Sequence, residues 1–450
     1  MNSPMPTPGS GIPPGYVRVE SQVEGITVYA PAPHVEQIPD AQTFKCPNCG
    51  ATTAFDPRAA SVTCSNCGSM YALNARRVGR DANEFEFTLD TLHSAPRGWG
   101  VTRRDLHCEK CGATTSVSPT HQHAQRTSSS ERVDASPTEL STTCPFCGSN
   151  RVAARTAVPD AFRPRFLVPF KIERDACASL AREWLKRGWM YPRELVNAAY
   201  GAQFVGIYLS FWTFRARVQG NWRAEVGHEI TENYFDVSQA KFKTRTRLEW
   251  KWQQGNVVLA FDDELETGTS HIRAQLLKRL APFDLNALVT YDPGYLAGWR
   301  AQSYEIALDD AWDVARAQMR EKTRAAAYAD IDSKHARNFS VNAVFDDEAW
   351  RLVLLPVYLA TYRFRDKTYQ LVINGQTGKV AGDKPIDWKK VLLIVAVLIV
   401  PGILLAALAF GFGAVGYETG GIFLFGGILF CVGAVAAVWA LQQAMDAGKA

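Results

Sequence analysis

The sequence lacks the short motifs that mark common hydrolases and nucleotide-binding enzymes. It contains no G-x-S-x-G, no H-E-x-x-H and no Rossmann glycine fingerprint. The segment NGQTGK at 374–379 resembles a phosphate-binding loop only superficially, because it lacks the four-residue glycine spacing and the Ser or Thr after the lysine. We interpret it as a tight turn. We therefore nominate no catalytic residue and expect that the protein is not an enzyme.

The sequence also lacks a large net charge. The formal charge is +4 over 450 residues, and each zinc ion held by four thiolates would contribute a further net charge of about −2. This balance argues against a strongly basic nucleic-acid-binding protein, although a local basic patch is compatible with it.

A secretory signal is missing as well. The N-terminal segment has no basic stretch followed by an apolar run, so we expect the cysteines to stay reduced. Residues 1–45 are rich in proline, with glycine, serine and threonine, and they show no apolar period. This composition predicts a disordered tail.

The cysteines are present in a pattern typical of metal sites. Eight of the ten form four C-x-x-C pairs, and each pair is followed by a glycine, which can adopt the positive φ of a metal-binding knuckle. Four thiolates complete a tetrahedral structural zinc site with no open position for catalysis. We predict tandem zinc ribbons over residues 46–150, the second interrupted by a flexible insertion at 114–143. The ligands of the two Zn²⁺ ions are Cys46, Cys49, Cys64 and Cys67, and Cys108, Cys111, Cys144 and Cys147.

Long apolar runs are absent until residue 391 and then occur twice. Residues 391–412 and 421–441 are uncharged and long enough to cross a bilayer as helices, which needs about 20 residues. Trp388 and three lysines precede the first run, whereas the short connection has no basic residue. These features predict a transmembrane hairpin over 391–441 in the cytoplasmic membrane. The positive-inside tendency places the N-terminal domains and the C-terminal tail in the cytoplasm.

The region 157–387 predicts an antiparallel α+β domain. FLVPFKI (166–172) is typical of a strand, a helix follows, and a strand pair turns near Gly220-Asn221. A strand at Ala301–Ile306, a helix that starts at Asp309 and buries Trp312, and a hairpin repeat this order. We therefore predict the α+β fold class with a duplicated β-α-β-β unit.

Residues 241–252, KFKTRTRLEWKW, predict a strand with aromatic side chains on one face and basic ones on the other. The basic face can contact nucleic-acid phosphates or anionic lipid headgroups, or it can be the solvated face of a half-buried strand, which we favour. The candidate contacts are Lys241, Lys243, Arg245, Arg247 and Lys251. The acidic run at 262–266 we interpret as a charged turn and not a cation site, because no glycine-spaced calcium loop surrounds it.

Several segments together resemble a bacterial family of TFIIB-type zinc-ribbon membrane proteins. They are the CxxCG ribbons, VPFKI, YLSFWTFRA, FDDEL, LLPVYLATYRF, VINGQTGKVAGDKP and the terminal hairpin. Members are often labelled as a primosomal replication helicase, but a helicase requires an ATP-binding phosphate loop, and this sequence lacks one. Only the eight paired cysteines carry over as functional residues, and the long second ribbon departs from the usual spacing.

The chain is also loosely similar to YdjG-like zinc-ribbon membrane proteins, which are associated with PspA-type envelope-stress proteins and SPFH scaffolds. This resemblance implies a membrane-tethered adaptor that recruits such protein partners. The alternative is a membrane-associated nucleic-acid-binding protein that uses the ribbons and residues 241–252. The two hypotheses differ in the expected partner and in the salt dependence of binding.

Overall fold

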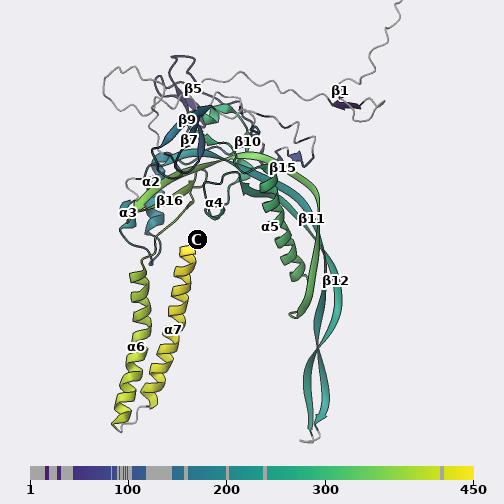
Figure 1. Cartoon of the computed structure of the whole chain (residues 1–450), viewed down its shortest axis with the longest axis vertical. Coiled ribbons are helices and arrows are strands. Elements are labelled where there is room, and N and C mark those ends of the chain that lie inside the picture. The colour runs from purple at the N-terminus through teal and green to yellow at the C-terminus, as the bar shows by residue number, and fades with distance from the viewer. Residues whose placement is uncertain are drawn as a thin grey trace, which may run out of the picture.

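The protein has a mixed α+β fold in which a large sheet carries two long projections (Figure 1). The structure is a computed structural model. It describes residues 16–19, 28–31 and 44–449, except for 83, 89–90, 92–94, 96, 98, 100–103, 118–143, 157–160, 199–201, 237–240 and 416–419. One projection is an extension of the sheet, and the other is a pair of C-terminal helices.

Two long antiparallel strands form the centre of the sheet. β11 (Val205–Asp236) pairs with β15 (Ala336–Phe364) over most of its length. Their inner halves are rich in β-branched and aromatic residues and are buried on both faces, as a central strand requires. The neighbouring strands are β10 (Phe166–Leu167), β12 (Lys241–Thr267), β13 (Val289–Thr290), β14 (Arg300–Gln302), β16 (Lys367–Asn374) and β17 (Val380–Gly382).

In the part of the chain that the structure describes, four α-helices pack against this sheet. They are α2 (Arg174–Lys186), α3 (Leu195–Ala198), α4 (Ala274–Leu280) and α5 (Leu308–Ala329). The inward face of α5 includes Trp312, Ala315 and Met319, as the sequence predicts, and these side chains pack on aromatic residues of β11. The order strand, helix, hairpin occurs twice, as β10-α2-β11-β12 and β14-α5-β15-β16. A duplicated β-α-β-β unit is compatible with this order and stays a prediction.

The turn predicted near Gly220-Asn221 is wrong, because β11 continues as one strand to Asp236. Gly220 lies in mid-strand, paired with Val257 on one side and Ala343 on the other. A Cβ atom there would lie 2.6 Å from Cγ2 of Thr323 on α5. The glycine therefore lets helix α5 approach the sheet closely. In the sequence, a glycine needed for such close packing looks the same as a glycine in a hairpin turn.

The charged turn predicted at 262–266 is also wrong. These residues lie inside β12, where the pairing with β11 shifts by one residue and Asp263 has a φ of 57°. A β-bulge therefore accommodates the acidic run. The turn predicted at 374–379 is confirmed, since it joins β16 to β17 and Gly378 has a φ of 76°.

The ribbon region merges with the body. β7 (Arg104–Cys108), β8 (Thr114–Val117) and β9 (Val152–Thr156) belong to the main sheet, because β8 pairs with β14. The predicted insertion at 114–143 therefore starts too early: Thr114–Val117 is a strand, and 118–143 lie outside the described residues. β6 (Phe85–Glu86) also joins the main sheet, whereas β3 (Thr53–Asp56), β4 (Ser61–Cys64) and β5 (Met70–Tyr71) form a separate one.

The N-terminal region 1–45 is only partly described. β1 (Tyr16–Val19) pairs antiparallel with β2 (Val28–Pro31), so the predicted tail contains a short two-stranded sheet. Valine and tyrosine residues in both segments favour strands. The prediction of a disordered tail depends on proline content and does not take these residues into account. Phe44 is buried against Val62 and Ala297, so packing begins before the first cysteine.

The first projection, which we call the arm, consists of 225–236 of β11 and 241–252 of β12. Pairing between β11 and β15 ends at Val226 and Ala336, so the outer arm is a two-stranded ribbon. The second projection consists of α6 (Trp388–Ala414) and α7 (Gly420–Lys449). Both extend from the body in the same direction along the long axis of the molecule (Figure 1).

Candidate functional site

The first cysteine cluster has the geometry of a tetrahedral metal site. The sulfur atoms of Cys46, Cys49, Cys64 and Cys67 all lie within 4.8 Å of one another. The Cys46–Cys67 and Cys49–Cys64 sulfur separations are 3.6 and 3.5 Å. Four sulfurs placed at Zn–S distances of about 2.3 Å would lie roughly 3.8 Å apart, so the cluster fits a zinc-sized ion.

The second cluster repeats this arrangement within the main sheet. Its four sulfur atoms, from Cys108, Cys111, Cys144 and Cys147, also lie within 4.8 Å of one another. The Cys108–Cys147 and Cys111–Cys144 separations are both 3.7 Å. The predicted ligands are therefore brought together in two separate sets of four, and each set can hold a metal ion.

A glycine with positive φ closes each of the four knuckles, as the sequence predicts. The φ angles of Gly50, Gly68, Gly112 and Gly148 lie between 70° and 79°. Each glycine N–H donates to the carbonyl of the first cysteine of its pair, with N–O distances between 2.8 and 3.0 Å. A residue with a side chain is strained at such a φ, so the glycines fix the turn that converges the sulfurs.

Polar neighbours favour the thiolate form of two of the four cysteines in the first cluster. A hydrogen bond from Ser69 is the main cause that lowers the pKa of Cys67 to about 6, and Tyr71 lowers the pKa of Cys46 from 3.0 Å away. Deprotonated sulfur is the form that binds metal. Asn48 and Asn66 direct amide groups at sulfur atoms of the opposite pair, at 3.9 and 3.6 Å. The asparagine in both CPNC and CSNC was the available sequence signal for these contacts.

Both clusters are tied to the hydrophobic core of the body. Phe55 in the first ribbon is buried, its N–H donates to Ala297, and its carbonyl accepts from the Trp299 indole at 3.0 Å. In the second ribbon Cys108 and Cys144 are themselves members of the largest core cluster. Loss of a metal ion from either site would therefore disturb the body as well as the ribbon.

The C-terminal helices are long and apolar enough to cross a membrane. The two candidate spans are Trp388–Phe412 and Gly420–Met445, and only 11% and 17% of their most apolar windows are buried. A hairpin at the core of a soluble protein would be mostly buried, whereas here leucine, valine and phenylalanine side chains are exposed around both helices. The spans slightly exceed the predicted 391–412 and 421–441.

Small residues hold these two helices together. A Cβ atom on Gly433 would lie 2.1 Å from the carbonyl oxygen of Leu398, and one on Gly402 would lie 2.6 Å from the backbone of Phe430. Close backbone contact at glycines is the usual way in which helices associate inside membranes, where apolar side chains gain nothing by leaving lipid.

The basic residues of 241–252 lie on the arm, and acidic neighbours accompany them. Lys241, Lys243, Arg245, Arg247 and Lys251 occupy alternate positions of β12 and therefore share one face. Arg247 forms an ion pair of 2.8 Å with Glu232, and Lys251 one of 3.0 Å with Glu249. The arm contains five acidic residues for these five basic ones. This balance weakens the arm as a polyanion-binding surface, because phosphate contacts require uncompensated positive charge.

No motif in the sequence indicates the buried ion-pair network that the body contains. The Arg351 side chain is almost fully buried and forms an ion pair with Asp263. It also donates a hydrogen bond to the carbonyl of Ala82 at 3.0 Å. Burial raises the pKa of Asp263 and Glu84. These two acids and Asp262 lie within 4.8 Å of one another. Arg351 pairs with both Asp263 and Glu84, so we interpret the group as a structural ion-pair network.

Comparison with known proteins gives one informative similarity. No protein-family model matches the chain, and no solved structure matches it. The chain is 24% identical over 244 residues to the uncharacterized protein YdjG of Bacillus subtilis (strain 168). The alignment covers 51% of this chain and 65% of YdjG, so the chain spans less than two thirds of that relative. The family resemblance inferred from the motifs stays a prediction at this identity.

Proposed function

We propose that this protein is a membrane-tethered cytoplasmic adaptor that binds protein partners through its arm and zinc ribbons. The observation that carries the proposal is the combination of an exposed apolar helix pair with a long, unenclosed β-ribbon on one body. An adaptor needs surface area and attachment, and the arm and the helix pair supply both. The two cysteine clusters serve in this proposal as closed structural Zn²⁺ sites that stabilise the body.

The end of the arm supports a protein partner. The Phe235 and Phe242 side chains are 49% and 78% exposed and contact each other with ring centres 5.1 Å apart. Exposed aromatic residues are typical anchors of protein interfaces, where they bury large areas at little entropic cost. The mixed charges around them suit a protein surface better than a nucleic-acid backbone.

Positive charge near the helix pair supports a cytoplasmic body. Lys389 and Lys390 lie in the first turn of α6, and Lys384 precedes it. Lys186 and Arg193 on the body line a cleft together with Lys390. Basic residues gather on the cytoplasmic side of membrane spans, so we propose that the body and both ends of the helix pair face the cytoplasm.

The arm must stay outside the bilayer in this proposal. It projects in the same direction as α6 and α7 (Figure 1), but its charged side chains are too costly to place in hydrocarbon. The arm therefore stays in the aqueous phase, near the membrane surface, when the helix pair is inserted. The PspA-like and SPFH-type proteins implied by the family resemblance would meet it there.

The test is purification of the full-length protein from native membranes in a mild detergent, with nuclease treatment and mass spectrometry. We expect a protein partner at fixed stoichiometry that survives nuclease and is lost when Phe235 and Phe242 are both replaced by serine. The double replacement of Val314 and Val344, exposed valines away from the arm tip, is the control. A protein that purifies without a stoichiometric partner, or with nuclease-sensitive nucleic acid only, would overturn the proposal.

A further inference from the structure

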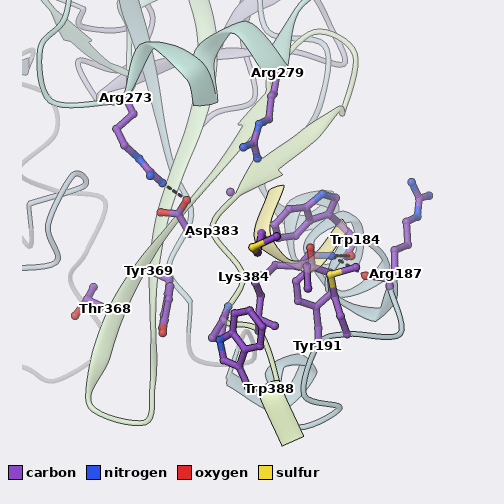
Figure 2. Close-up of a pocket in the computed structure, with 17 residues that line it drawn as sticks. Trp184, Arg187, Tyr191, Arg273, Arg279, Thr368, Tyr369, Asp383, Lys384 and Trp388 are labelled. Atoms are coloured by element: carbon purple, nitrogen blue, oxygen red, sulfur yellow. Dashed lines mark hydrogen bonds and ion pairs between the residues drawn. The ribbon is translucent and has the colours of Figure 1, made fainter. Parts of the chain in front are cut away.

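A basic cleft lies between the body and the start of the helix pair, and no sequence motif indicates it. We call it the basal cleft. It has a volume of about 980 Å³ and is partly open to solvent. Its walls come from the end of α2 and the following loop, α4, the β16–β17 hairpin, the linker before α6 and the last turns of α7 (Figure 2).

The charge inside the basal cleft is unbalanced in favour of cations. Arg273 forms an ion pair with Asp383, which is the one acid among the lining residues. The Arg279 side chain extends from α4 into the cleft (Figure 2), and it has no ion pair with any residue that the structure describes. It lies close enough to Tyr191 to offset part of the rise that burial causes in the pKa of that phenol.

Lys384 provides a second positive charge at the floor of the cleft. Its amino group donates to the Arg187 carbonyl at 3.0 Å and to the Trp184 carbonyl at 2.5 Å. It also lies 4.7 Å from the centre of the Tyr191 ring. These contacts hold the ammonium, and therefore its positive charge, in a fixed position beside the cleft. Arg187 also lines the cleft, and its positive charge helps to lower the pKa of Lys384.

The surroundings of the cleft match the headgroup layer of a membrane. Trp388 begins α6, and Ala444 and Met445 end the apolar part of α7, so the cleft lies level with the start of the first candidate span and the end of the second. Trp184, Tyr191 and Trp388 supply the aromatic rings that are enriched at this depth. Arginine with a free guanidinium binds phosphate through paired N–H groups.

We propose that the basal cleft binds a phosphate group, with Arg279 as its ligand and Lys384 as a second positive charge that attracts it. The phosphate is that of an anionic lipid headgroup or of a soluble phosphate compound, and both present the same oxygen atoms. The lipid source rests on the proposed membrane insertion. The phosphate chemistry does not, because Arg279 and Lys384 are placed by the body.

The test compares wild type, Arg279→Gln and Lys278→Gln as full-length proteins. Lys278→Gln removes the same charge from the adjacent, exposed position of α4. Each protein is placed in nanodiscs of phosphatidylcholine, with or without phosphatidylglycerol, and retained lipid is counted by native mass spectrometry. We expect wild type and Lys278→Gln to retain phosphatidylglycerol selectively, and Arg279→Gln to lose roughly tenfold or more of that selectivity. Arg279→Lys, which keeps the charge, should retain part of it.

A second arm separates the two sources of phosphate. Lipid-free protein in detergent is titrated with inorganic phosphate by calorimetry. Binding that depends on Arg279, without selectivity for phosphatidylglycerol, would assign the cleft to a soluble phosphate compound. The proposal would be overturned if the protein neither selects phosphatidylglycerol nor binds inorganic phosphate. It would also be overturned if Arg279→Gln did either as well as wild type. Failure of the protein to enter nanodiscs would instead count against membrane insertion. The absence of a protein partner in the purification would count against the adaptor role. The three failures are therefore distinguishable.

Discussion

The amino group of Lys384 lies 3.9 Å from the centre of the Trp184 ring. This contact joins the linker before α6 to the last turn of α2, and the bonds from Lys384 to the Trp184 and Arg187 carbonyls reinforce it. Cations over tryptophan contribute about 0.5–2 kcal/mol, depending on desolvation. The helix pair is therefore attached to the body at a defined residue, next to the proposed phosphate site.

Phosphate binding in the basal cleft should depend on pH. Burial, with a smaller contribution from Arg187, lowers the pKa of Lys384 to about 8. The other charged or titratable groups around it are Asp383, Arg273, Arg279 and Tyr191. A lysine attracts phosphate only while it is protonated, so selectivity for phosphatidylglycerol should be full below this pKa and fall as the pH rises through it.

The same nanodisc assay, repeated between about pH 6 and pH 10, measures this effect. Bound phosphate stabilises the charged lysine and shifts the fall to higher pH. Lys384→Arg keeps its charge over the whole range and should flatten the profile. A wild-type profile that is already flat would show that the charge of Lys384 does not contribute to binding.

The two cysteine clusters should bind one ion each. We expect wild-type protein to contain two zinc ions per chain, and Cys64→Ser or Cys144→Ser to contain one, measured by elemental analysis of the purified protein. Cys144→Ser should lower the melting temperature more, because Cys144 belongs to the main core whereas the first ribbon has its own sheet. Cys431→Ser is the control, since Cys431 is exposed on α7. Full zinc content in both cluster variants would contradict the assignment.

Packing of the helix pair should depend on glycine at one position and not at another. Gly433→Leu forces a side chain against the Leu398 carbonyl, whereas a Cβ atom on Gly427 meets nothing within 4 Å. We expect Gly433→Leu to lower the melting temperature of the protein in detergent, at a cost of about 1–3 kcal/mol. Gly427→Leu should behave like wild type. Equal melting of the two variants would show that the helices do not pack through this face.

The buried Arg351 should be essential for the stability of the body. Arg351→Met leaves Asp263 and Glu84 without their shared buried cation, and the loss should be about 3–5 kcal/mol. The comparison is Arg363→Met, whose side chain is 74% exposed and whose loss should change stability by less than about 0.5 kcal/mol. Unfolding midpoints of the two variants in detergent measure the difference. An Arg351→Met protein as stable as wild type would contradict this account of the network.

Local patterns in the sequence predict the metal clusters and the apolar helices well. A C-x-x-C-G unit contains both the ligands and the glycine that orients them, so each knuckle is a local property. A run of apolar residues likewise determines a helix without reference to the rest of the chain. The inward face of α5 follows from its helical period.

Features that depend on distant residues could not be predicted in this way. Gly220 resembles a turn residue until Thr323 of α5 is known to lie against it. Arg351 and Asp263 are separated by 88 residues, and neither carries a motif. The basal cleft brings together five segments, from α2 to α7. The length of the arm also depends on the pairing between its two strands. The alternation of side chains along one strand does not reveal that pairing.

The central claim is that the arm contacts a protein partner at the cytoplasmic side of the membrane. A photo-crosslinking amino acid at Phe242, with the same group at Val314 as control, tests it most directly in intact cells. Crosslinks from position 242 to one recurring protein, absent at position 314, are the predicted result. Crosslinks to nucleic acid or lipid alone, or no crosslink at all, would contradict the adaptor account.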